Sequence, residues 1–446
     1  MFVCREKTGL RLFFALEIGI ASQLSLFLSG AAHAQVVTQN LSALGSAEDG
    51  LSVDAFQSDT DRRYGSQGLQ YGPWAISGGA SEGWGYTNNA DQMMGGVPSA
   101  ASVTNANLEG LLTQNRRLLD IGATVSQQYY PERKLQNQTN WTAFLRGYEK
   151  IGRHRLSYRF DHEKMTQMPS DLGAAEVNQP IPYFTEDLSL DDRIETRGRL
   201  SIIPNFDLKR FLFTDLPGDN IYLHQSYRDR LLFSEGVGVR YSLAEGSDLL
   251  LIGQGVEIRY SNNRFHLPSR DSNGFSALLG YDYEMPGPFS IRVLGGYQNR
   301  FYNVSAYKTL NTFYAELRGT WIPTRMTRVS LTVSRGISDS AFESVIGFVY
   351  TTAALDIRQV YSRNVVLHAG FQIQQGGAGQ SPAIFNNTPL YQTMTSQLNA
   401  NFSVGVDWAL DQHFSLEASN VYRNTNASGS SRYSIDMAMI SVKYQL

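Results

Sequence analysis

The sequence has almost no cysteine. It contains one in 446 residues, Cys4, which lies at the extreme N-terminus and is not placed as the acylated cysteine of a lipoprotein. The rest of the chain therefore excludes disulfide bonds, thiolate nucleophiles and cysteine-ligated metals. A cysteine-free chain also suits export into an oxidising periplasm.

The sequence also lacks an excess of either charge and lacks long apolar runs. The formal net charge is -3, from 38 basic and 41 acidic residues, so nucleic acid is not an expected partner. No apolar run after Gln35 approaches the ~20 residues that a membrane helix needs. What is abundant is glycine, with 40 residues, and aromatic residues, at 12%. An exported chain of this kind can still cross a membrane as a closed β-barrel.

The N-terminus has the parts of a secretory signal peptide. A short basic start precedes an apolar stretch from Leu12 to Leu28, which is interrupted by Glu17. Ala34 ends a small-x-small cleavage motif, so Gln35 is the expected mature N-terminus. We expect residues 1–34 to be removed during export through the periplasm to the outer membrane. The alternative is a membrane anchor that stays on.

From Trp74 onward, apolar and polar residues alternate with a period of two over segments of about 10 to 15 residues. One example places Phe402, Val404, Val406 and Trp408 on one face and Asn401, Ser403, Gly405 and Asp407 on the other. In a barrel, lipid contacts the apolar face and the lumen takes the polar face. A soluble β-sandwich shows the same alternation, so this pattern alone leaves both open.

The connections favour the barrel over the sandwich. Tight turns are expected at Ile151-Gly152, Pro204-Asn205, Glu245-Gly246, Pro286-Gly287, Pro323-Thr324, Ser362-Arg363 and Asp411-Gln412. Longer polar loops are expected at Met165–Thr185, Asn262–Ser272, Gly376–Tyr391 and Asn424–Ser431. Outer-membrane barrels have short periplasmic turns and longer outer loops, whereas a sandwich has no reason to keep this alternation.

The C-terminus and the aromatic residues point the same way. The chain ends on Leu446 with Tyr444 two residues before it, which resembles the signal read by the barrel-assembly machinery, although phenylalanine is the usual last residue. Trp321 and Trp408 each lie near a tight turn, where the periplasmic aromatic girdle is expected. The outer girdle is expected to contain Tyr86, Tyr129, Tyr260, Tyr302 and Tyr422.

The strand count must be even if both ends of the barrel lie in the periplasm. We expect strands to start near Arg117, Asn140, Arg153, Leu188, Phe206, Arg230, Ser247, Ser272, Pro288, Lys308, Arg325, Val345, Arg363, Thr393, His413 and Arg432. Two further strands, Trp74–Thr87 and Ser102–Leu112, bring the antiparallel up-and-down barrel to 18 strands, with 16 as the alternative. The barrel then spans residues 71–446, and residues 35–70 form a flexible periplasmic arm, which could instead tuck into the pore.

Many charged residues fall on the polar phase of these strands. A charge facing lipid near the midplane costs roughly 2–4 kcal/mol, so these residues are expected to line a wet or ion-paired lumen. Mixed signs argue against a strongly ion-selective pore. The candidate lumen-lining residues are Arg146, Arg159, Arg240, Glu257, Arg259, Asp282, Arg292, Glu316, Arg318, Arg328, Asp407, Glu417 and Lys443.

No catalytic, cofactor or metal site is expected. The histidines are scattered, and neither a metal-binding helix motif nor a Gly-x-Ser-x-Gly nucleophile motif is present. The run Asp161-His162-Glu163 at an outer strand end is the nearest candidate for binding a cation or acting as a base. A solvated loop histidine is the ordinary explanation.

Several stretches resemble one family of outer-membrane barrels. They are Gly72-Pro73-Trp74, Tyr86-Thr87-Asn88-Asn89, Arg117-Leu118-Leu119-Asp120-Ile121-Gly122-Ala123, Ile181-Pro182-Tyr183, Trp321-Ile322-Pro323-Thr324 with Thr327, Ser334-Arg335, Arg363-Asn364-Val365 and the last two strands. From about Gly72 to Leu446, the chain resembles the β-barrel porin type 2 family, whose members are commonly associated with exopolysaccharide export. Asn88 stands where the family usually has aspartate.

This resemblance implies passage or retention of a polysaccharide at the outer membrane. The implied partners are outer-membrane lipids and lipopolysaccharide, the barrel-assembly machinery, the polysaccharide itself and an inner-membrane co-polymerase system. A general small-solute porin is the first alternative, and a barrel-borne surface enzyme or adhesin is the second. The Gly376–Tyr391 loop is a candidate for a constriction folded into the pore.

Overall fold

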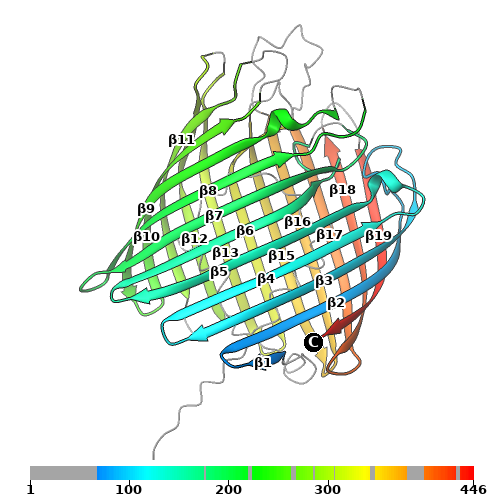
Figure 1. Cartoon of the computed structure of the whole chain (residues 1–446), viewed down its shortest axis with the longest axis horizontal. Coiled ribbons are helices and arrows are strands. Elements are labelled where there is room, and N and C mark those ends of the chain that lie inside the picture. Colours follow the sequence, from blue (N-terminus) through cyan, green and yellow to red (C-terminus); the bar gives the residue numbers. More distant parts are fainter. Residues whose placement is uncertain are drawn as a thin grey trace, which may run out of the picture.

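The computed structural model describes residues 68–174, 177–218, 223–262, 268–284, 287–305, 307–341, 347–378, 396–427 and 432–446. The expected signal peptide, its cleavage site and most of the expected arm lie outside these ranges. The described chain forms one closed barrel of tilted antiparallel strands (Figure 1). Among these residues, no helix has both the length and the apolar character to span a bilayer.

The barrel wall consists of β2 to β19, and each strand pairs with its neighbours along the chain. The strands are β1 (Leu69–Tyr71), β2 (Trp74–Thr87), β3 (Ser99–Gln114), β4 (Arg117–Tyr129), β5 (Gln138–Ile151), β6 (His154–Gln167), β7 (Ile181–Glu195), β8 (Leu200–Phe213), β9 (Arg230–Ala244), β10 (Ser247–Tyr260), β11 (Ser272–Glu284), β12 (Phe289–Tyr302), β13 (Leu310–Thr324), β14 (Thr327–Ser338), β15 (Phe348–Ser362), β16 (Val365–Ala378), β17 (Ser396–Ala409), β18 (Phe414–Ala427) and β19 (Arg432–Gln445). Two 3-10 turns, η1 (Lys134–Gln136) and η3 (Ser226–Arg228), lie in the long loops.

The expected count of 18 wall strands is confirmed, but two turns were misplaced. Pro323 and Thr324, expected to form a turn, are the last residues of β13, and the turn follows at residues 325–326. The prediction put a turn at Pro204-Asn205, whereas the chain turns at residues 196–199 and Pro204 lies inside β8. Proline has no N–H to donate, and the β7–β8 ladder is interrupted beside it, between the pairs Asp191↔Asn205 and Ile194↔Ile202. Pro204 therefore marks a local break in a strand. As a result, β7 and β8 begin six to seven residues earlier than expected.

Short and long connections alternate as expected. At one rim the strands are joined by two to four residues, as at 152–153 and 245–246, and at the other by longer loops such as 168–180 and 214–229. Gly152 in the first of these turns has a φ of 64°, a conformation that favours glycine. By the usual orientation of outer-membrane barrels, the rim with short turns faces the periplasm.

The outer face of the wall is apolar. Exposed side chains such as Leu251, Leu279 and Phe313 point outward, while the residues between them are buried. Trp321 and Trp408 are exposed near the short turns, as expected of a periplasmic girdle. Tyr86, Tyr129 and Tyr422 are exposed near the long loops.

Tyr260 and Tyr302 do not join that outer girdle. Each lies on the inward-facing phase of its strand, Tyr260 beside the buried Ile258 and Tyr302 beside the buried Arg300. Arginine side chains lie over both rings. The expectation for these two tyrosines was therefore wrong. Alternate residues of a strand point to opposite faces, so nearness to a long loop does not by itself place a side chain on the outer face.

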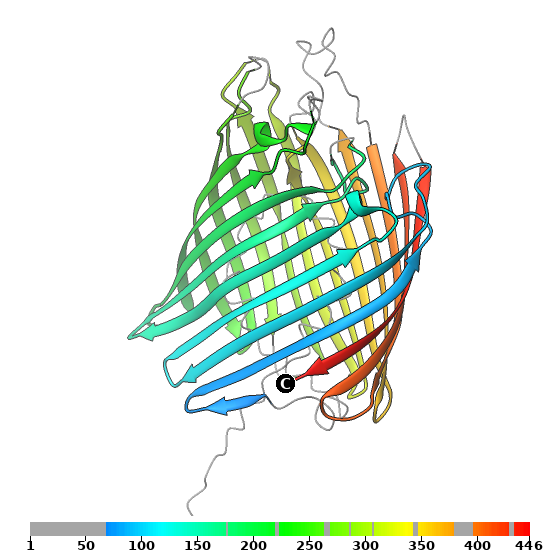
Figure 2. The ribbon, with the colours of Figure 1, turned by 45° about the vertical axis from the view of Figure 1, so that its right-hand side comes forward.

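The barrel closes where β19 meets β2. The two strands pair from Gly79↔Gln445 to Thr87↔Met437, so the first residues of β2 extend beyond the end of β19 (Figure 2). The short strand β1 pairs with this overhang through Leu69↔Ile76, and the N–H of Leu446 donates to the carbonyl of Gly78. These contacts satisfy backbone groups that would otherwise form an open sheet edge.

We expect the outer face to tolerate charge only near its rims. Leu279→Arg, at the middle of β11, should lower the free energy of unfolding by roughly 2–4 kcal/mol, because it places a cation in the hydrocarbon core. Leu243→Arg, near the periplasmic end of β9, should cost about 0–1 kcal/mol. Urea titration of the barrel refolded in lipid vesicles measures the free energy of unfolding of both variants. Equal losses would contradict the placement of Leu279 near the membrane midplane and of Leu243 near its surface.

Candidate functional site in the barrel lumen

Most of the predicted lumen-lining residues do face the interior. On the inward phase of their strands lie Arg146, Arg159, Arg240, Asp282, Arg292, Glu316, Arg318, Arg328, Asp407, Glu417 and Lys443. Glu257 and Arg259 do not, because they share the outer phase of β10 with Leu249 and Leu251. These two side chains form an ion pair of 2.6 Å with each other. They lie at the loop end of β10, where a mutual pair on the outside of the barrel is tolerated.

The inward charges form ion-pair networks. Asp161 forms ion pairs of 3.0 Å with both Arg146 and Arg159, and Asp187 pairs with Lys209 at 2.9 Å. On the opposite side of the closure, Lys443 lies 2.6 Å from Glu417 and 3.1 Å from Asp407. His368 lies 3.3 Å from the same Asp407 carboxylate. These networks balance charge of both signs along the inner wall.

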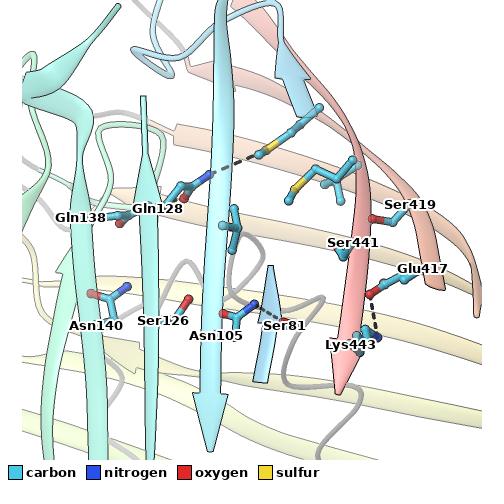
Figure 3. A pocket seen from close by; sticks show the side chains of 14 residues that line it. Ser81, Asn105, Ser126, Gln128, Gln138, Asn140, Glu417, Ser419, Ser441 and Lys443 are labelled. Atoms are coloured by element: carbon cyan, nitrogen blue, oxygen red, sulfur yellow. Dashed lines mark hydrogen bonds and ion pairs between the residues drawn. The ribbon is translucent and has the colours of Figure 1, made fainter. Parts of the chain in front are cut away.

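One part of the inner wall is rich in neutral polar groups. Inward side chains of β2 to β5, β18 and β19 line a hollow of about 760 Å³, a volume that includes open solvent (Figure 3). Ser81, Asn105, Ser126, Gln128, Gln138, Asn140, Ser419 and Ser441 supply hydroxyl and amide groups to it, and Val103, Val421, Met437 and Met439 add apolar groups. We call the eight polar residues the amide wall. Asn105 donates to the hydroxyl of Ser81, and Glu417 and Lys443 lie at its lower end.

Another part of the inner wall is apolar, which the polar phase of the sequence did not predict. Buried side chains on the inward phase of β8 and β10 to β13 form one cluster, made of Ile203, Leu250, Ile252, Leu278, Leu294 and Tyr314. In β10, both phases are apolar in its first half, since Leu249 and Leu251 face outward and Leu250 and Ile252 face inward. A period-two reading cannot assign faces to such a segment.

Two loop segments reach the inner wall at the end of the barrel that carries the long loops. The first is 168–174, after β6. Its Ser170 accepts from Arg423 of β18 at 2.6 Å, and its backbone carbonyl accepts from Gln397 and Asn399 of β17 at 3.2 and 3.1 Å. The segment therefore leaves the wall at β6 and is held by inward side chains of β17 and β18.

The second segment, 339–341, follows β14. The N–H of Ala341 donates to the carbonyl of Gly173, which joins the two segments. Leu172 packs on Phe348 and Tyr350, inward residues of β15. Gly173 has a φ of 69°, and an added Cβ would lie 2.6 Å from the ring of Phe348, so glycine is required here on both counts. We call residues 168–174 and 339–341 the luminal bridge.

The bridge ends in a cluster of arginines and aromatic rings. Asp339 pairs with Arg230 of β9 at 3.0 Å and with Arg300 of β12 at 2.5 Å. Arg270 donates to the carbonyl of Ser340 at 3.1 Å. The guanidinium of Arg230 lies 4.3 Å from the ring centre of Phe211, a cation–π arrangement. The bridge thus connects β17 and β18 to β9 and β12 across the lumen.

The two buried carboxyl groups of the bridge differ in their titration. Burial raises the pKa of Asp171 to about 7, although Arg423 and the N–H of Met168 act in the opposite direction. Burial also opposes ionisation of Asp339, but Arg300 and Arg230 hold the pKa of this carboxyl below its ordinary value. Asp339 is therefore the ionised anchor of the bridge, and Asp171 is the carboxyl that titrates near neutral pH.

The run Asp161-His162-Glu163 does not converge on a site. Asp161 and Glu163 face the lumen, where they accept from Arg146 and Thr185, whereas His162 lies on the outer phase against Trp141. Alternate residues of a strand point to opposite faces, so three consecutive residues cannot act together. Among the described residues, no group of three His, Cys, Asp or Glu side chains could hold a metal. The candidate Gly376–Tyr391 constriction falls largely outside the described residues.

The family described as "Putative beta-barrel porin 2" matches residues 61–446. The chain belongs to this porin family. As a member, the porin is an outer-membrane β-barrel, and the resemblance stated from its sequence is confirmed. A comparison with curated proteins gives no match.

Solved structures similar to the porin are distant. OccD3 of Pseudomonas aeruginosa has 10% identity and a TM-score of 0.39, covering 91% of this chain and 97% of that one. The FrpB iron transporter from Neisseria meningitidis has 9% identity and a TM-score of 0.40 over 81% of this chain, which spans 63% of that transporter. A bacterial polysaccharide outer membrane secretin has 8% identity and a TM-score of 0.33, covering 83% of this chain and 98% of that one.

We expect Arg423 to hold the luminal bridge in place. Arg423→Ala removes the donor to Ser170 and the cation that lies 3.8 Å from Asp171. Leaving the buried polar groups of the bridge without this donor costs roughly 1–3 kcal/mol, so the bridge should leave the wall and the pore should widen. Single-channel recordings in planar bilayers should show a larger conductance than wild type. Arg325→Ala, at an exposed periplasmic turn, is the control and should leave the conductance unchanged.

We expect the bridge to loosen as pH rises. A carboxyl whose folded pKa is raised stabilises the folded state below its unfolded pKa, and this contribution is lost as pH rises through the folded value. For Asp171 the window runs from the ordinary carboxyl pKa of about 4 up to about 7. Hydrogen exchange of residues 168–174, corrected for intrinsic rates, should therefore accelerate across this window. Asp171→Asn should remove this acceleration. If hydrogen exchange in the variant still accelerates with pH as in the wild type, a group other than Asp171 causes the effect.

Proposed function

We propose that the porin is a conduit through which an exopolysaccharide passes from the periplasm to the cell surface. The observation that carries the proposal is the amide wall. Its eight side chains are neutral, and each hydroxyl or carboxamide group can both donate and accept hydrogen bonds. Sugar hydroxyl groups have the same double capacity. A sugar chain therefore exchanges its bonds with water for equivalent bonds along this wall.

The charge pattern supports the same proposal. The inward ion-pair networks carry both signs, so the described residues of the lumen form no single-sign ring of the kind that selects ions. The luminal bridge narrows the end of the barrel that carries the long loops. A narrowed, charge-balanced lumen with a hydroxyl-like wall suits a flexible hydrophilic polymer that moves slowly in single file.

In this proposal the chain is exported through the periplasm, inserted by the barrel-assembly machinery through its C-terminal Tyr444 and Leu446, and surrounded by lipopolysaccharide. An inner-membrane polymerase and co-polymerase system supplies the polymer. The general small-solute porin is the competing function. The two differ in what a mutation of the amide wall should change.

The test is polymer location in a strain that lacks the gene. Released polysaccharide should fall and periplasmic polysaccharide should rise, and the wild-type gene should reverse both. Complementation with Asn105→Leu/Asn140→Leu should restore the barrel but not release, because two of the four carboxamides of the wall are replaced by apolar groups. Leu279→Ala, on the outer face, is the matched control and should restore release.

Unchanged polymer release in the deletion strain would contradict the conduit. If uptake of small solutes falls instead, the general porin takes its place. Heat-modifiable migration on gels confirms that each variant is folded before release is compared.

A further inference from the structure

Four arginines are buried together at the end of the luminal bridge, and passage of a neutral polymer does not require them. Arg228, Arg230, Arg270 and Arg300 are each at most 6% exposed. Two come from wall strands, Arg230 at the start of β9 and Arg300 at the end of β12, and two from neighbouring loops, Arg228 in η3 and Arg270 just before β11. Such a concentration of buried guanidinium groups is costly unless each is paired or hydrogen-bonded.

Part of this pairing comes from the bridge. Asp339 is gripped by Arg230 and Arg300 through its two carboxylate oxygens. The next two residues present backbone carbonyls, which accept from Arg270 and from the hydroxyl of Tyr227. The segment 339–341 therefore offers the wall one carboxylate followed by two neutral acceptors.

The wall itself is fixed independently of Asp339. Arg300 donates through its Nε to Ser272 at 2.9 Å, and Arg228 donates to Gln167 at 2.8 Å and to Gln225 at 3.0 Å. Arg228 lies 3.9 Å from the ring centre of Phe213, and Arg270 lies 4.4 Å from that of Tyr260. Arg230 and Arg300 are thus held at strand ends, and Arg228 and Arg270, which lie in loops, are held by hydrogen bonds and ring contacts that do not involve Asp339.

A set of donors that keep their own hydrogen bonds and ring contacts and also face a carboxylate is the arrangement of a binding site occupied by its own chain. We propose that Arg230, Arg300, Arg270 and Tyr227 form a carboxylate subsite for an acidic saccharide chain, and that Asp339 occupies it until the saccharide displaces it. A uronic acid residue offers what segment 339–341 offers, a carboxylate beside neutral oxygen acceptors. Arginine pairs with carboxylates in a planar, directional manner that suits this recognition.

This inference rests on the proposed function and narrows its substrate to a polymer that carries carboxylates. The amide wall binds the hydroxyl groups of any sugar, whereas the carboxylate subsite adds a requirement for charge. An acidic polymer satisfies both parts of the lumen, and a neutral polymer satisfies only the amide wall. The bridge then closes the pore when no acidic chain is present.

The test is isothermal titration calorimetry on the full-length barrel folded in detergent. Tri-galacturonate is the acidic probe, maltotriose the neutral probe and galacturonic acid the single carboxylate. Asp339→Asn removes the competing carboxylate, so it should tighten tri-galacturonate binding by about tenfold, the scale of one charged hydrogen bond. Arg300→Gln and, independently, Arg230→Gln should weaken it by about tenfold. Asp436→Asn, which removes an exposed carboxylate from the outer face of β19, is the charge-matched control.

Several outcomes would overturn the subsite. Equal binding of tri-galacturonate and maltotriose, or the same affinity in Asp339→Asn and Asp436→Asn, would show that the arginines do not recognise the ligand. Equal affinity for galacturonic acid and tri-galacturonate would reduce it to a site for small carboxylates. In each case polymer release in the deletion strain still tests the conduit separately. If the exported polysaccharide is neutral, the conduit proposal stands and the carboxylate subsite is rejected.

Discussion

The structure depends on one constraint: inside a bilayer, every backbone N–H and C=O must find a partner within the protein. Eighteen strands meet it by closing on themselves, and the closure is the place where the constraint is hardest to satisfy. There β2 extends past the end of β19, and the chain supplies β1 on one side and the N–H of Leu446 on the other. Both ends of the wall are thus used to complete the same edge.

Closure also decides what the interior can be. The wall must present apolar groups to lipid on one phase, so polar and charged groups are confined to the other, and there they have to pair with each other or meet water. The ion-pair networks around Asp161 and Asp407 are the paired solution, and the amide wall is the wet one. The luminal bridge adds a third kind of surface, in which loop backbone and wall side chains satisfy each other.

The sequence predicted those parts of the fold that depend on local pattern. Period-two alternation and turn residues were enough for 18 strands and for the inward orientation of Arg240 or Lys443. They failed where the local signal is ambiguous. Pro204 resembles a turn but interrupts a strand, and β10 is apolar on both phases, so Glu257 and Arg259 were assigned to the wrong face. The bridge was missed altogether, because its contacts join residues far apart in the chain, such as Ser170 and Arg423, and no local pattern records them.

The position of the bridge bears on how a polymer could be exported without leaving the membrane open. An amide wall by itself would pass water and small solutes as readily as sugar. In the proposed conduit, a bridge fixed on one side by Arg423 and on the other by a carboxylate between Arg230 and Arg300 would obstruct that route with contacts that are individually exchangeable. Each contact has a counterpart on an acidic saccharide: hydroxyl groups in place of Ser170 and a carboxylate in place of Asp339. The bonds that hold the bridge are therefore of the same chemical kind as those that a passing acidic chain would form, so its displacement would be an exchange of partners that leaves few buried charges unpaired.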